Sequence, residues 1–183
     1  MSRYIRPRLP GASIFFTVTL RDPGSDLLLR EIAALREAVM VERCRRPFAI
    51  DAWVVLPDHM HCLWTLPPGD ADYPLRWQSI KAEFSRRVAP RVPRSPGKQR
   101  RGELGIWQRR YWEHHIRDDA DMQMHLRYCW ADPVAHGLAQ RPADWAFSSF
   151  HREVRAGLLR PDWAGTAPNG TFGERDSTPR LIA

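Results

Sequence analysis

The sequence predicts an α+β fold of the ferredoxin-like type, in which helices pack on one face of an antiparallel sheet. Apolar residues switch between alternating and helical spacing in the order strand, helix, two strands, helix, strand, helix, which is the order of a split βαβ arrangement. The 183 residues suffice for one domain. Their composition, 43% hydrophobic and 27% charged, is that of a globular protein. We expect one domain over residues 1–160 and a disordered tail, rich in Gly, Pro, Ser and Thr, over 161–183.

β-branched and aromatic residues mark the strands of the first half of the chain, and apolar residues three and four positions apart mark its helix. The first residues are basic and rich in proline, which predicts an extended arm. A tight turn is expected at Pro57-Asp58. In order, the predicted elements are the arm at 3–11, a strand at 14–20, a helix at 26–45 and two strands at 48–56 and 61–66.

The second half contains two further helices and one strand. Asp118, with Asp121 three residues later, is an N-cap signal, and Pro133 is expected to end the helix that Asp118 begins. Five basic residues and three prolines between 90 and 105 predict a long, positively charged loop. In order, the predicted elements are a helix at 73–88, this loop, an aromatic strand at 106–116, a helix from 118 to 132 and a short helical or irregular segment at 142–158.

The charge of the chain points to a polyanionic partner. The net charge is +7 and the pI is about 10.0, and such a field attracts nucleic acid first and acidic membrane surfaces second. No run of about 18 apolar residues is present, so a transmembrane helix is excluded. The basic start lacks the apolar stretch of a secretory signal. Three cysteines without a CxxC pair favour a reducing cytoplasm over a disulfide scaffold.

Basic residues outside the apolar patterns are the candidate contacts to nucleic acid. We expect the arm and the 91–101 part of the loop to carry most of the electrostatic affinity, because such proline-rich segments contribute little to a core. The candidates are Arg3, Arg6, Arg8, Lys81, Arg86, Arg100, Arg101, Arg109 and Arg110.

The segment LPDHMHCLW contains the pattern that most strongly suggests chemistry. His59 and His61 are two residues apart in a predicted strand, so their side chains share one face. Two imidazoles on one face form half of a metal site. The alternative is two ordinary histidines at a strand end, one hydrogen-bonded and one exposed, and for an arbitrary HxH this alternative is favoured. The apolar neighbours Val54, Val55, Leu63 and Trp64 place this pair on a buried strand.

The helix predicted after Asp118 offers further polar groups. At 100° per residue, Met122, Leu126 and Cys129 form its core-facing side. Tyr128 and Asp132 are neighbours at i and i+4, so one face presents a hydroxyl and a carboxylate. The alternative reading is an aspartate near a helix end and a half-buried ring. The adjacent polar side consists of Asp121, His125, Tyr128 and Asp132.

The aromatic strand contains two more histidines. Strand alternation places Arg110, Trp112 and His114 on one face and Trp107, Arg109 and Tyr111 on the other. His114 and His115 therefore face opposite ways, and at most one of them can join a metal site.

A tyrosine that attacks a phosphodiester beside a divalent ion is chemically sound. The ion polarises the phosphoryl oxygen, and the phenol, whose ordinary pKa is about 10, loses its proton as a covalent phosphotyrosine forms. The bond energy is retained, so strands can be rejoined without a nucleotide cofactor.

These residues resemble the REP-associated tyrosine transposases, bacterial members of the HUH single-strand DNA endonuclease superfamily. The resemblance lies in four stretches in the same order and covers roughly residues 2–165. It implies a metal-dependent DNA endonuclease and strand transferase with a ferredoxin-like fold. It also implies action on single-stranded hairpins of the repeated extragenic palindrome type, as a monomer or homodimer in the bacterial cytoplasm at the nucleoid. The four stretches are 1–20, 49–87, 105–138 and 141–157.

The resemblance also implies roles for particular residues. His59 and His61 match the two histidines that bind the divalent ion, Mg²⁺ or Mn²⁺, and Tyr128 matches the single nucleophilic tyrosine. The family usually has an Asn-Pro-Val segment after the tyrosine, whereas this chain has Asp132-Pro133-Val134. The asparagine position implies the third metal ligand, and an aspartate there is a harder anion that should hold Mg²⁺ or Mn²⁺ more tightly.

Two other classes of function compete with this one. A DNA-hairpin binding protein that has lost its chemistry would share the fold and the charge, with Asp132 as the lesion. An iron oxygenase with two histidines and one carboxylate could use His59, His61 and Asp132, but such sites usually draw a His-x-acid pair and a distant histidine. That arrangement does not match this chain, and the basic loop would be unexplained.

Overall fold

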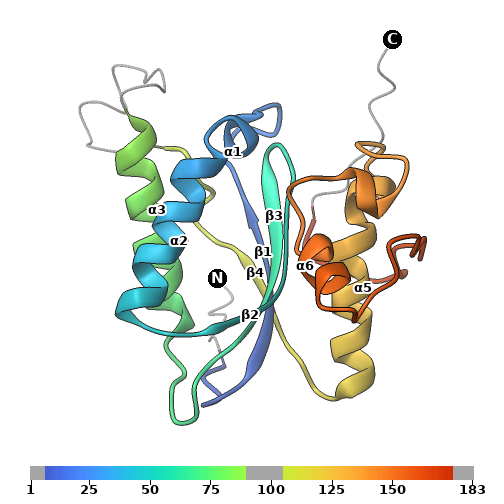
Figure 1. Ribbon diagram of the computed structural model, residues 1–183. Coiled ribbons are helices and arrows are strands. Elements are labelled where there is room, and N and C mark those ends of the chain that lie inside the picture. The colour runs from blue at the N-terminus through green and yellow to red at the C-terminus, as the bar shows by residue number, and fades with distance from the viewer. Residues whose placement is uncertain (1–6, 90–104, 175–183) are drawn as a thin grey trace.

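The computed structural model describes residues 7–89 and 105–174, and its centre is a four-stranded antiparallel sheet (Figure 1). The strands lie in the order β2-β3-β1-β4, with every neighbouring pair antiparallel. This is the strand order of a ferredoxin-like sheet, and the predicted fold class is confirmed. The strands are β1 (Ser13–Thr19), β2 (Ala49–Val55), β3 (His59–Thr65) and β4 (Trp112–His115).

Helices cover both faces of this sheet, not one face as predicted (Figure 1). The two helices that connect strands, α2 (Ile32–Arg45) and α3 (Tyr73–Val88), share one face. After β4 the chain crosses to the other face, where α5 (Asp119–Ala135) and α6 (Phe150–Arg155) pack. The central strands are apolar on both sides, because Phe15 of β1 packs on the α5 side while its neighbour Phe16 packs on the α2 side. Apolar side chains on both faces require two covering layers.

The helix predicted over 26–45 is divided in two. The short α1 (Leu27–Arg30) ends at Glu31, whose non-helical backbone separates it from α2. The change of direction lets Leu28 of α1 and Leu35 of α2 both reach the core, where they are buried.

The aromatic strand is shorter than the predicted 106–116. Only the four residues of β4 pair with β1, and Trp107 forms an isolated bridge to Leu20. Contacts with α3 hold the preceding segment away from the sheet. The Trp107 indole donates to the carbonyl of Lys81, and the Lys81 ammonium donates to the carbonyl of Gln108. Trp112 and His114 share the α5 face, as alternation predicts.

Helix α5 begins as predicted and ends later. The Asp118 carboxylate accepts the backbone N–H of Asp121 at 2.8 Å, which confirms the N-cap. The predicted end before Pro133 is wrong, because the helix continues to Ala135. The chain leaves the helix at Gly137, whose φ of 67° is the left-handed conformation common just after helix ends.

Tryptophan rings form much of the core on the α2 side. Trp64 of β3 and Trp77 of α3 stack with centroids 4.3 Å apart, and neither is exposed. Within the described part of the chain, none of the helices combines the length and the apolar character needed to cross a bilayer.

Candidate active site

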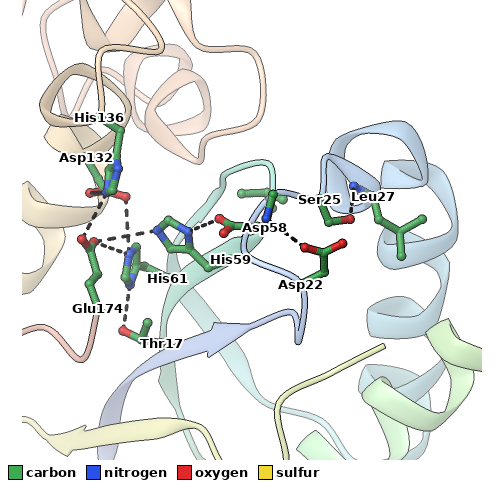
Figure 2. Close-up of polar contacts among 12 residues, drawn as sticks. Thr17, Asp22, Ser25, Leu27, Asp58, His59, His61, Asp132, His136 and Glu174 are labelled. Atoms are coloured by element: carbon green, nitrogen blue, oxygen red, sulfur yellow. Dashed lines mark hydrogen bonds and ion pairs between the residues drawn. The ribbon is translucent and has the colours of Figure 1, made fainter. Parts of the chain in front are cut away.

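The two histidines of the HxH pattern stand at the start of β3 on the α5 face of the sheet (Figure 2). Their ring centroids are 5.1 Å apart. His61 is fully buried, and the side chain of His59 is 12% exposed. The turn at Pro57-Asp58 places His59 at the first residue of the strand, so the pair lies at one end of the sheet.

Hydrogen bonds determine which nitrogen of each ring faces the site. His59 Nδ1 donates to the Asp58 carboxylate at 2.7 Å. The Thr17 hydroxyl donates its proton to the carbonyl of Phe172, so it accepts from His61 Nδ1, which lies 2.8 Å away. Both rings therefore carry a proton on Nδ1 and present an unprotonated Nε2, which is the form in which histidine binds a metal.

Helix α5 turns its polar side toward the sheet. Asp121, His125, Tyr128 and Asp132 follow one another by four, three and four residues, and all four are buried. The prediction that Met122 and Leu126 face the core is wrong, since both are only partly buried. The polar side packs inward because imidazole, hydroxyl and carboxylate groups find partners across the sheet. The ring of Tyr128 lies 5.1 Å from that of His61, centroid to centroid.

A segment near the end of the described chain completes the site. The ring of Phe172 stacks on Tyr128 with centroids 3.6 Å apart, and the Tyr128 hydroxyl donates to the Glu174 carboxylate. Gly173, between them, has a φ of +75°, and a Cβ there would lie 2.3 Å from Trp112. Only glycine fits at this position, so it lets Phe172 and Glu174 both face the site.

Four ligand atoms converge here (Figure 2). His61 Nε2 lies 2.9 Å from Glu174 Oε1 and 3.4 Å from Asp132 Oδ2, and His59 Nε2 lies 3.9 Å from Glu174 Oε1. In the tautomers derived above, all of these atoms are acceptors. Within the described residues, His59 Nε2 and Asp132 Oδ2 are buried without a hydrogen-bond partner. Acceptors that converge without donors fit a divalent cation, and this nitrogen and oxygen set suits Mg²⁺ or Mn²⁺.

Two groups beside this cluster have strongly shifted pKa values. Hydrogen bonds to Asp132 and then to Glu174 raise the pKa of His136 to about 10, so its ring is a cation at neutral pH. Burial, and then the charges of Asp132 and Glu174, raise the pKa of Tyr128 above its ordinary value. The phenol is therefore protonated at neutral pH, and nucleophilic attack requires a nearby cation or base.

The candidate nucleic-acid contacts fall into three groups. Arg8, Arg109 and Arg110 are exposed. Lys81 and Arg86 are engaged within the protein. The Lys81 ammonium lies over the Trp107 and Tyr111 rings, and the Arg86 guanidinium binds Glu83. The third group lies outside the described residues: Arg3, Arg6, Arg100 and Arg101.

Comparison with known proteins assigns the chain to a family, although no family model matches it. It is 44% identical over 175 residues to the REP-associated tyrosine transposase of Escherichia coli K12, a match that covers 96% of this chain and 98% of the relative. A related protein of Haemophilus influenzae is 41% identical and covers 90% and 94%. The chain belongs to the REP-associated tyrosine transposases. A solved structure of such a transposase bound to a REP hairpin has a TM-score of 0.83 and 44% identity, and covers 96% of this chain and 98% of that one.

Three residues of the site were missed by the sequence analysis of this REP-associated tyrosine transposase. Thr17 and Glu174 are far in sequence from His61 and carry no local pattern. Glu174 also stands in the Gly- and Ser-rich segment assigned to the tail. His136 was detectable, because it follows Asp132 by four residues and shares its helix face. The aspartate at 132, where the family usually has asparagine, directs Oδ2 toward His61.

Proposed function

We propose that this transposase nicks and rejoins single-stranded DNA hairpins through a covalent 5′-phosphotyrosine on Tyr128. The observation that carries the proposal is the convergence of the Tyr128 hydroxyl and four cation-ligand atoms on one face of the sheet. The hairpin-bound relative supports DNA hairpins of the repeated extragenic palindrome type as the substrate. We place the protein in the bacterial cytoplasm, where it meets the chromosome, acting as a monomer or homodimer.

His59, His61, Asp132 and Glu174 would hold Mg²⁺ or Mn²⁺. The bound ion supplies Lewis-acid stabilisation of the charge that develops on the phosphate. Tyr128 Oη forms a bond to phosphorus, and the bond from phosphorus to the 3′ oxygen of the preceding nucleotide breaks. That nucleotide is left with a free 3′ hydroxyl. The hydrogen bond from Tyr128 to Glu174 gives the phenolic proton a path away from the nucleophile.

Asp58 and Thr17 act on the histidines and make no contact with DNA in this mechanism. Their hydrogen bonds keep each Nδ1 protonated and each Nε2 directed into the site. The alternative, a hairpin-binding protein without chemistry, would make Asp132 a defect. Against this, Asp132 Oδ2 lies 3.4 Å from His61 Nε2, within the ligand cluster. The placement supports a working carboxylate ligand.

The test is formation of a covalent adduct with hairpin DNA labelled on the 3′ side of the cut. Wild-type protein with Mg²⁺ or Mn²⁺ should give a labelled band on a denaturing protein gel, and EDTA should abolish it. Tyr128→Phe removes only the hydroxyl, so hairpin binding should persist while the adduct is lost. Tyr111→Phe is the matched control, because it makes the same change away from the ligand cluster and should retain the adduct. A labelled band from Tyr128→Phe would show that another group is the nucleophile.

A further inference from the structure

A second cluster of histidines and a carboxylate lies on the same face of the sheet, toward the beginning of α5. It consists of His114 on β4 and of Asp121 and His125 on the first two turns of α5. The ring of Phe15 separates it from the Tyr128 site, since this ring lies 4.8 Å from that of His125 and 5.5 Å from that of His61, centroid to centroid. The mechanism proposed above uses none of these three residues.

Their ligand atoms are close together. His114 Nε2 lies 2.9 Å from Asp121 Oδ2, and His125 Nδ1 lies 3.2 Å from Asp121 Oδ1. The His114 and His125 rings stack with centroids 4.7 Å apart and planes inclined by 15°, so they approach the carboxylate side by side. Asp121 and His125 are i and i+4 on one helix, a spacing that places two ligands on one face.

One carboxylate oxygen of this cluster lacks a donor. Asp121 Oδ2 accepts from His114 Nε2 and from the backbone and side chain of Arg117. Asp121 Oδ1 is buried and has no hydrogen-bond partner within the described residues. His125 Nδ1 is near it but makes its hydrogen bond to the Asp121 carbonyl, 2.8 Å away. A buried carboxylate oxygen without a donor is costly unless a cation or donor reaches it.

The protonation states suit a cation site. Burial is the main cause that lowers the pKa of His125, so the ring is neutral at pH 7 and has a lone pair. Burial alone would raise the pKa of Asp121, but hydrogen bonds from His114 and Arg117 outweigh it and lower that pKa. The carboxylate is therefore an anion. Two neutral imidazoles and one carboxylate are the donor set of Zn²⁺ and similar borderline divalent ions.

We propose that His114, Asp121 and His125 form a second divalent-cation site, selective for Zn²⁺-like ions and separate from the Tyr128 site. Binding requires each imidazole to present an unprotonated nitrogen to the ion, so the protons of His114 and His125 shift to their other ring nitrogens. The Arg117 side chain, which is 71% exposed, is free to turn into solvent. The ion then joins β4 to the first turn of α5, the helix that carries Tyr128. The side chain of His114 is 27% exposed, which provides a path for entry.

The experiment measures metal binding without DNA, in a variant whose first site is disabled by His59→Ala, His61→Ala and Glu174→Gln. We expect this protein to bind one Zn²⁺ or Co²⁺ per chain by calorimetry, and Co²⁺ to give a visible absorption band. Adding His114→Ala should weaken binding by about tenfold or more, and Asp121→Asn provides the same test with less change of shape. His115→Ala is the matched control, because its ring faces Tyr73 on the opposite side of the sheet.

The results separate a metal site from a purely hydrogen-bonded junction. An anomalous diffraction peak between His114, Asp121 and His125 in zinc-soaked crystals of the disabled variant would support the site directly, without further substitutions. Absence of binding by this variant would overturn the proposal, and so would binding that His115→Ala weakens as much as His114→Ala. Because DNA cleavage is not measured, failure here is independent of the function proposed for Tyr128.

Discussion

Replacing Asp121 by asparagine removes a negative charge from the junction of α5 and β4 while keeping the size of the side chain. Asp121 Oδ2 accepts from His114 Nε2 at 2.9 Å and from the backbone N–H of Arg117 at 3.0 Å. A hydrogen bond to a charged group contributes about 1.5–3 kcal/mol and a neutral one about 0.5–1.5 kcal/mol. Each of these two bonds therefore weakens by about 1 kcal/mol. We expect the metal-free variant to lose about 2 kcal/mol of unfolding free energy at pH 7.

The loss should depend on pH in a defined direction. The pKa of Asp121 in the folded protein is below its ordinary value of about 3.9. The stability that this charge contributes is therefore fully present above about pH 4, and it falls as the pH drops toward the folded-state pKa. The difference between wild type and Asp121→Asn should be constant from neutral pH down to about 5 and should shrink at about pH 3.

The measurement is urea unfolding followed by tryptophan fluorescence, in EDTA, at pH 7 and pH 3. Asp119→Asn is the matched control, since Asp119 is an exposed acid in the same first turn of α5. It shares the interaction with the helix dipole and should cost well under 1 kcal/mol. A loss for Asp121→Asn no larger than that of the control, or one as large at pH 3 as at pH 7, would refute the reasoning.

Three further predictions concern the Tyr128 site and the DNA. Asp132→Asn, which restores the residue usual in the family, should keep or raise the rate of adduct formation, whereas Asp132→Ala should lower it; equal rates on the gel would exclude a ligand role. Glu174→Gln should weaken Mn²⁺ binding in calorimetry by about tenfold or more, and an unchanged affinity would remove Glu174 from the ligand set. Arg109→Ala with Arg110→Ala should weaken hairpin binding and flatten its salt dependence by about one unit per lost phosphate contact. Arg86→Ala should change this slope less, because the guanidinium is bound to a glutamate of its own helix, and the opposite order would place the DNA on α3.

Periodicity predicted the relations that lie within one element. It indicated that His59 and His61 share a face, that Tyr128 and Asp132 are neighbours, and that Asp118 caps α5. These relations follow from the repeat of a strand or a helix, which is set by local backbone geometry. The order of strands and helices was likewise visible, because each element needs its own apolar pattern to be buried.

Tertiary structure alone decided which face of α5 meets the sheet and what completes the site. Apolar spacing favoured Met122 and Leu126 as the inward side, yet the polar side turned inward because His61, Glu174 and His114 offer it partners. Glu174 lies 113 residues from His61 in sequence. Contacts over such separations leave no periodic signal, because their geometry depends on how whole elements pack rather than on the backbone between neighbouring residues. The sequence by itself therefore determined the parts of the site, and packing determined how they meet.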